Sequence, residues 1–171
     1  MKAIGVLGGT FDPVHHGHLR VALELVDLLA LDEVRLVPVG SPAHRDAPQA
    51  SAAQRVRMLK AALGDVPGLA VDVRETERAG PSFTVDTLAS MRADFADASL
   101  TLIIGMDQFQ VLSHWHRWAE IPEFAHICVV HRPGASTTHS PEIAQLLLER
   151  QVTDPARLRE ALAGYVYMGN V

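Results

Sequence analysis

Residues 8–18 read GGTFDPVHHGH; an apolar run at 3–7 precedes them, and they lead into an amphipathic segment at 17–31. The apolar run predicts a β-strand, and the amphipathic segment predicts an α-helix because its apolar residues recur at helical spacing. A glycine-rich turn between a strand and a helix directs backbone N–H groups and the positive end of the helix dipole at one point. The stretch therefore predicts an α/β fold with an anion site, and phosphate is the anion we expect.

The alternation of strand and helix continues along the chain. Further strands are predicted at 33–39, 69–73, 99–104, 126–131 and 165–168, and further helices at 85–95, 141–150 and 155–163. Another helix opens at the capping box Ser51-Ala52-Ala53-Gln54 and runs to Gly64. We expect an open, mainly parallel, Rossmann-like sheet with helices on both faces, in a single domain over residues 1–171.

The composition excludes several other classes of protein. No apolar run approaches the roughly 18 residues of a membrane span, so no membrane partner is expected. The single cysteine, Cys128, lies in an apolar run, and the chain opens without a signal-peptide pattern, so we expect a cytoplasmic protein. A net charge of −5 argues against a nucleic-acid partner.

The histidines of residues 8–18 indicate which phosphate chemistry to expect. The stretch has neither the Gly-Lys-Ser/Thr of a P-loop nor the G-x-G-x-x-G spacing of dinucleotide-binding folds. Instead, His15 and His18 flank Gly17 at the first helical turn, where both imidazoles can donate hydrogen bonds to phosphoryl oxygens. A solvated loop and a metal site are the alternatives, and His16 is expected to take no part.

The eleven residues 8–18 resemble the signature of the nucleotidyltransferase superfamily marked by H-x-G-H, specifically that of bacterial nicotinate mononucleotide adenylyltransferases. Other marks of this family resemble the stretches at 38–45, 54–58, 81–88, 105–107, 115–118 and 131–133. The resemblance implies the nucleotidyltransferase fold and transfer of the adenylyl group of ATP to nicotinate mononucleotide, giving deamido-NAD and pyrophosphate. A phosphate oxygen would attack the α-phosphorus directly, without a covalent intermediate.

The resemblance also implies an ATP site. His15 and His18 would be catalytic and would contact the phosphates; the other ATP-binding residues would be Gly8, Gly9, Thr10, Phe11, Gly105, Asp107 and Arg132. Asp107 would accept ribose hydroxyls, with an N-cap as the alternative, and Arg132 could instead be a solvated charge. Because the sequence shows no compact carboxylate cluster, Mg²⁺ is expected to be held mainly by ATP phosphates and water, with no protein metal ligands.

The nicotinate mononucleotide site is implied in the same way. His44 and Arg45 would bind the phosphate, Phe83 and Thr84 would read the carboxylate through backbone groups, and Trp115, with His116 beside it, would stack on the pyridine ring. The family often has tyrosine at the position of Phe83. The alternatives are a solvated charge at Arg45 and core packing of Trp115, and Trp118 is expected in the core.

One family motif, I-S-S-T-x-[IV]-R, has no counterpart in this chain. In the family its serine, threonine and arginine hold the triphosphate, so we expect the C-terminal part of the fold to be missing. Two alternative functions stay open: a shortened nucleotide-binding module with little or no turnover, and the sibling phosphopantetheine adenylyltransferase.

Overall fold

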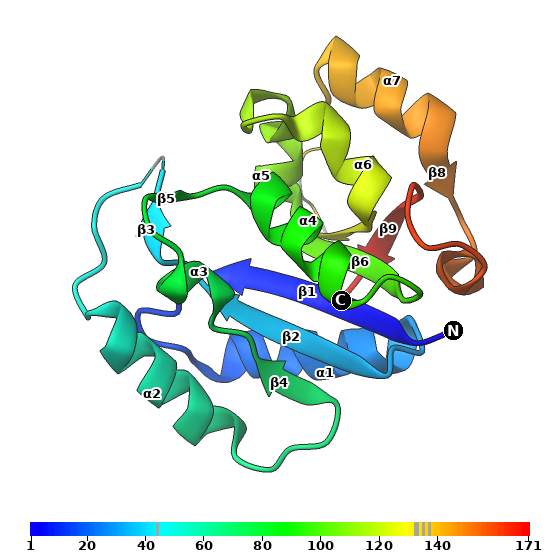
Figure 1. Ribbon diagram of the computed structural model, residues 1–171. Coiled ribbons are helices and arrows are strands. Elements are labelled where there is room, and N and C mark those ends of the chain that lie inside the picture. Colours follow the sequence, from blue (N-terminus) through cyan, green and yellow to red (C-terminus); the bar gives the residue numbers. More distant parts are fainter. Residues whose placement is uncertain (44, 132–133, 135, 137) are drawn as a thin grey trace.

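The computed structural model describes residues 1–43, 45–131, 134, 136 and 138–171. Its main sheet has seven strands: β1 (Ala3–Gly9), β2 (Glu33–Pro38), β4 (Leu69–Val71), β6 (Ser99–Gly105), β7 (His126–His131), β8 (Gln151–Val152) and β9 (Val166–Asn170). They lie in the order β4-β2-β1-β6-β7-β9-β8, and every neighbouring pair is parallel (Figure 1). The predicted open parallel sheet is confirmed.

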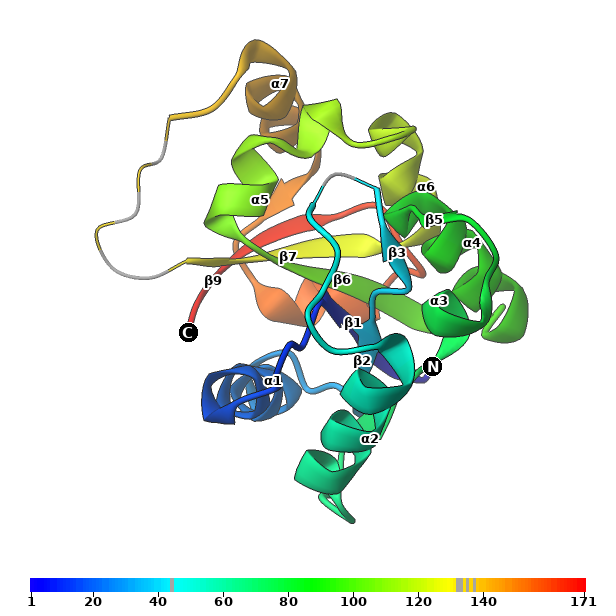
Figure 2. The same cartoon turned by 90° about the vertical axis from the view of Figure 1, so that its left-hand side faces the viewer.

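Helices cover both faces of this sheet, as predicted (Figure 2). The α-helices are α1 (His16–Leu28), α2 (Ala52–Leu63), α3 (Arg74–Glu77), α4 (Thr84–Asp94), α5 (Met106–Gln110), α6 (Ile121–Phe124) and α7 (Pro141–Arg150), and the short 3-10 helices are η1 (Leu112–His114), η2 (Trp118–Glu120) and η3 (Pro155–Arg159). Apolar residues of α4, α5, α6 and α7 form one core cluster with the sheet, and those of α1, α2 and η3 form another on the opposite face.

The two clusters follow from the alternation of side chains along the strands. In β1, Ile4 and Val6 belong to the first cluster and Ala3 to the second, because successive residues of a strand point to opposite faces. Ile103 and Ile104 of β6 separate in the same way. Both faces of the central strands are therefore buried, as expected for a parallel sheet.

Several predicted boundaries differ from the structure. Gly8 and Gly9, predicted as a turn, still pair with Val37 and Pro38 of β2, so β1 continues to Gly9. The helix predicted at 17–31 ends at Leu28, and the one predicted at 155–163 is only the 3-10 helix η3. The capping box is confirmed, because the hydroxyl of Ser51 accepts from the N–H of Gln54.

A second, two-stranded sheet stands beside the main one and has no strand signal in the sequence. β3 (Ser41–Pro42) pairs in parallel with β5 (Pro81–Ser82). It joins the segment after β2 to the segment before α4, near the carboxyl ends of β1 and β2 (Figure 1). Among the described residues, no helix is long and apolar enough to cross a membrane.

Candidate functional site

A cavity opens at the carboxyl end of the sheet, where the chain connections change direction. β1 and β6 are neighbours, but β2 lies on the outer side of β1 and β7 on the outer side of β6. Ligands of open α/β sheets bind at such a topological switch point. The cavity has a volume of about 280 Å³, and nine residues predicted to bind substrates line it: Gly8, Gly9, Thr10, Arg45, Phe83, Thr84, Gly105, Trp115 and His116.

Four other predicted site residues do not line the cavity. Within the described part of the chain these are Phe11, His15, His18 and Asp107, whereas His44 and Arg132 lie outside the described residues. Several wall residues are absent from the predicted set, and Glu75 and Thr87 are two of the polar ones. Glu75 lies on the four-residue helix α3 and Thr87 on α4, and nothing in the local pattern marks them as facing a site.

His15 and His18 cap the first turn of α1 reciprocally. Nδ1 of His15 accepts a hydrogen bond from the N–H of Gly17 at 3.1 Å, and Nδ1 of His18 accepts from the N–H of His15 at 3.2 Å. The two rings stack with centroids 3.8 Å apart. Because an accepting ring nitrogen carries no proton, each neutral ring bears its proton on Nε2, the atom that can donate to a phosphoryl oxygen.

Burial affects the protonation of His18. Its pKa lies below the usual value, first because burial disfavours the charged ring and then because His15 is adjacent. His18 is therefore neutral at pH 7, which matches the donor–acceptor pattern of its two nitrogens. The ring of Phe11 meets His18 edge-on at 5.0 Å between centroids.

A buried arginine holds the segment between β1 and α1 in place. The guanidinium of Arg55, which is 1% exposed, donates to the carbonyl oxygens of Thr10 at 2.9 Å and Val39 at 2.8 Å, and to that of Ala50 at 3.3 Å. Burial lowers the pKa of this guanidinium. Arg55 thus ties the end of β1 to the segment after β2. Nothing in the sequence pattern indicates that the carbonyls of Thr10 and Val39 are its partners.

Asp12 reinforces the same junction from the other side. Its carboxylate accepts hydrogen bonds from the N–H groups of Gln49 at 2.7 Å and Ala50 at 3.2 Å. These residues directly precede the capping box of α2, so Asp12 fixes residues 10–15 against that helix. Its place inside the conspicuous stretch 8–18 was the only sequence signal for this anchor.

Gly105 ends β6 and serves as the N-cap of α5, with Asp107 in the first turn. The alternative that Asp107 is itself the N-cap is therefore wrong. A Cβ on Gly105 would lie 2.6 Å from Oδ1 of Asp107, so this carboxylate lies directly over the glycine that lines the cavity. Asp107 is exposed and accepts a hydrogen bond from Nε2 of Gln108 at 3.2 Å.

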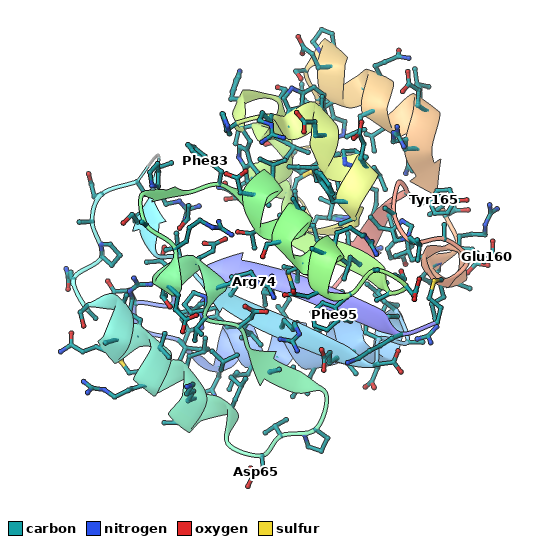
Figure 3. The ribbon with its side chains drawn as sticks, viewed as in Figure 1. Asp65, Arg74, Phe83, Phe95, Glu160 and Tyr165 are labelled. Carbon is teal, nitrogen blue, oxygen red and sulfur yellow. The ribbon has the colours of Figure 1, made fainter. Side chains whose placement is uncertain are left out.

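Aromatic side chains gather at the opposite side of the cavity. Phe83 is the N-cap residue of α4, next to β5 (Figure 3), and its ring lies 4.3 Å from that of His116 between centroids. Trp115 lines the cavity and also packs against the core cluster, so its core packing is observed and its stacking on a pyridine ring stays a prediction. Trp118 packs against the same cluster and is not among the described residues of the cavity wall.

The turn that carries Trp115 is tied to α4 by an ion pair of Arg117, which also pairs within its own turn. Nη1 of Arg117 lies 3.4 Å from Oδ1 of Asp86 in the first turn of α4, and Nη2 lies 2.6 Å from Oε2 of Glu120. Thr84 is the first residue of α4, where backbone N–H groups lack partners within the helix. The cavity therefore places backbone donors beside an aromatic wall.

The described lining of the cavity holds one arginine, Arg45 on the segment after β3, and one carboxylate, the buried Glu75 of α3. Arg45 is exposed, and no ion pair of Arg45 occurs within the described ranges. In the part of the chain that the structure describes, no group of three or more His, Cys, Asp or Glu side chains could hold a metal ion. The arrangement suits an anionic ligand with an aromatic ring.

Comparisons with known proteins give matches in both sequence and fold. Residues 6–160 match the family described as cytidylyltransferase-like. A relative from Methylococcus capsulatus, named "Probable nicotinate-nucleotide adenylyltransferase", is 47% identical over 165 residues, or 96% of this chain and 79% of that protein. One of the same name from Pseudomonas paraeruginosa is 50% identical over 159 residues, or 92% of this chain and 74% of that protein.

Solved structures show the same fold. The nicotinic acid mononucleotide adenylyltransferase of Plasmodium falciparum, complexed with NaAD, superposes with a TM-score of 0.71 at 15% identity, covering 100% of this chain and 76% of that chain. Its complex with APC superposes with the same TM-score over 75% of that chain. At this identity the likeness concerns the fold alone, whereas the match over residues 6–160 and the two relatives concern the sequence itself. This chain belongs to the cytidylyltransferase-like family of nucleotidyltransferases.

Proposed function

We propose that the protein transfers the adenylyl group of ATP to nicotinate mononucleotide, giving deamido-NAD and pyrophosphate. One observation carries the proposal: a single cavity joins the glycine-rich end of β1, which leads to the histidine-capped helix α1, to an aromatic wall at the N-terminus of α4. The first end suits a nucleoside triphosphate and the second a pyridine ring with a carboxylate. The names of the relatives support the same substrates.

The reaction requires positioning more than acid–base chemistry. A phosphate oxygen of the mononucleotide, already ionised at pH 7, attacks the α-phosphorus of ATP in line; a new P–O bond forms while the bond to pyrophosphate breaks. No general base is needed. His15 and His18 donate from Nε2 to phosphoryl oxygens, on which negative charge is concentrated during the transfer.

The remaining predicted residues orient the two substrates. Gly8, Gly9 and Thr10 approach ATP through backbone groups, with Phe11 behind them, and Gly105 and Asp107 contact ribose hydroxyls. Arg132 is assigned to the triphosphate or adenine. Such positioning supplies much of the rate acceleration in phosphoryl transfer.

On the mononucleotide side, Arg45 and His44 bind the phosphate. Trp115 stacks on the pyridine ring beside His116, and the carboxylate accepts hydrogen bonds from the backbone N–H groups at Phe83 and Thr84. Since backbone donors at a helix N-terminus favour an anion, we expect nicotinate mononucleotide to be preferred over nicotinamide mononucleotide.

A divalent metal is part of the proposal, since nucleotidyltransferases of this kind generally use one with ATP. The described residues offer no protein cage, so Mg²⁺ would be held by ATP phosphate oxygens and water. When bound, it neutralises charge on the transferring and leaving phosphates. The cytoplasmic location also stays a prediction, in keeping with two phosphorylated substrates.

A coupled assay of pyrophosphate release, with chromatography of the nucleotide product, tests the proposal. We expect equimolar pyrophosphate and deamido-NAD from ATP plus nicotinate mononucleotide, and little product with nicotinamide mononucleotide or with ATP alone. Tight nucleotide binding without turnover would instead support the nucleotide-binding module. Product from phosphopantetheine would support the sibling enzyme, for which the two named relatives offer no support.

A further inference from the structure

A buried carboxylate in the cavity wall has no part in the proposed reaction. Glu75 lies on α3, is 9% exposed and lines the cavity. Its Oε1 accepts a hydrogen bond at 2.7 Å from Oγ1 of Thr87, a residue of α4 that is 2% exposed. Burying a carboxyl group is costly unless it is hydrogen-bonded, so this contact is a strong constraint on how α3 and α4 pack.

The hydroxyl of Thr87 connects this carboxylate to the turn that faces the pyridine ring. The N–H of Thr87 donates to the carbonyl oxygen of Phe83 at 3.2 Å, which closes the first turn of α4. Nη1 of Arg78 donates to the same hydroxyl at 3.1 Å. The hydroxyl itself has two acceptors in reach, Oε1 of Glu75 at 2.7 Å and the carbonyl oxygen of Phe83 at 3.4 Å, and the shorter contact is that with Glu75. Glu75 thus holds the start of α4, and with it the backbone of Phe83 and Thr84.

The backbone of Glu75 meets the other mononucleotide segment. A Cβ on Gly40 would overlap the carbonyl oxygen of Glu75 and lie 3.2 Å from Oγ of Ser82, so the chain after β2 packs directly on α3. The residues that follow Gly40 form β3, whose Ser41 and Pro42 pair with β5. The segment that leads to Arg45 is therefore fixed against Glu75.

From these contacts we infer that Glu75 is a positioning residue for the mononucleotide. Through Thr87 on one side and Gly40 on the other, it sets the spacing between the turn at Phe83–Thr84 and the segment that carries Arg45. The inference rests on the proposed function, in which these segments bind the carboxylate and the phosphate of one substrate. Burial raises the pKa of Glu75, opposed by the hydroxyl of Thr87, as expected for a carboxyl held by few donors.

The contacts of Glu75 involve the segments proposed to bind the mononucleotide and not those proposed to bind ATP. The junction that faces ATP is held by Arg55 and Asp12, and neither donates to nor accepts from Glu75 or Thr87 in the described residues. Loss of the contact between Glu75 and Thr87 should therefore weaken the mononucleotide and leave ATP unaffected. A general loss of packing would change both substrates together.

Thr87→Val tests this inference because it keeps the shape of the side chain and removes the hydroxyl. We expect KM for nicotinate mononucleotide to rise on the order of 10-fold, the loss of about one hydrogen bond to a charged group, with KM for ATP and kcat little changed. Thr87→Ser should recover most of the affinity. Thr76→Val is the matched control, because it removes a hydroxyl of α3 that bonds only within its own helix, to the carbonyl of Val73.

Calorimetric titration of each variant with nicotinate mononucleotide, without ATP, gives a second measure that does not need turnover. If the wild type binds the mononucleotide but shows no transfer, the proposed function fails and the titrations still test the role of Glu75. If the wild type turns over, and Thr87→Val weakens both substrates equally or neither, the inference is overturned. Should Thr87→Val melt below the assay temperature, Glu75→Met provides the same comparison, because it keeps the length of the side chain and removes the acceptor for the Thr87 hydroxyl; unchanged mononucleotide affinity there would also refute the inference.

Discussion

Because His15 and His18 cap α1 reciprocally, the contribution of His18 to stability can be measured separately from its proposed contribution to catalysis. Nδ1 of His18 accepts from the backbone of His15 at 3.2 Å, which leaves Nε2 for the substrate. Glutamine is a preferred side chain at this third position of a capping box, because its amide oxygen can accept the same N–H. His18→Gln should therefore keep the cap and lose the imidazole, whereas His18→Ala should lose both.

The magnitudes follow from these two contributions. His18→Ala should lose about 1 kcal/mol of unfolding free energy from the cap, or roughly 2–4 °C in Tm for a chain of this size. His18→Gln should stay within about 0.5 kcal/mol of wild type, as for an ordinary surface substitution. Both should reduce kcat by about 10² to 10³, the typical effect of removing one donor to a developing oxyanion.

The assay combines thermal melting with pyrophosphate release at saturating ATP and nicotinate mononucleotide. His16→Gln is the matched control, since His16 is exposed and is predicted to take no part. A His18→Gln variant with kcat close to wild type would remove the imidazole from the mechanism. An unchanged Tm in His18→Ala would show that the cap contributes no stability.

Four further outcomes are expected. Arg55→Met should lower the free energy of unfolding in urea by about 3 to 5 kcal/mol, from three hydrogen bonds of a charged donor at roughly 1.5 kcal/mol each; a loss below about 1 kcal/mol would contradict its anchoring role. Gly40→Ala should raise KM for nicotinate mononucleotide more than KM for ATP, because the new methyl group displaces the chain from Glu75; equal effects in the same rate assay would be inconsistent with this. Burial lowers the pKa of His126, so the contribution of its neutral ring to the free energy of unfolding is complete above the unfolded pKa of about 6.5 and is lost as pH falls below that value. Urea unfolding curves at pH 8 and 5.5 should show this loss of stability at the lower pH, and the loss should be smaller in His126→Gln. Burial raises the pKa of Cys128 to about 12, so Ellman's reagent should react only on unfolding; rapid labelling of the native protein would refute this.

Local sequence patterns were sufficient for most of the framework. Alternating apolar runs predicted the strands of a parallel sheet, and the capping box at Ser51 predicted the start of α2. The stretch 8–18 predicted a strand, a helix N-terminus and two histidines in its first turn. These features depend on residues within a few positions of one another, so their physical causes are readable along the chain.

The contacts that shape the cavity join distant segments. Arg55 reaches carbonyls 45 and 16 residues away, and the hydroxyl of Thr87 reaches a carboxylate 12 residues away on another helix. The extension of β1 through Gly8 and Gly9 likewise requires β2 as its partner. None of these partners is specified by a local pattern, because each depends on which strands become neighbours.

The sequence by itself determined the fold class and the strand–helix junction, because periodicity and capping act over short distances, whereas the candidate substrate residues were implied by the resemblance to a family. Only the tertiary structure decided that His15 and His18 stand outside the lining of the cavity and turn Nδ1 to the backbone. It also decided that the side chain of Glu75 bonds to Thr87 while its backbone packs on the chain at Gly40. The reason is that a buried polar group must find its hydrogen-bond partner in space, and the order of strands in the sheet determines which partners come within reach.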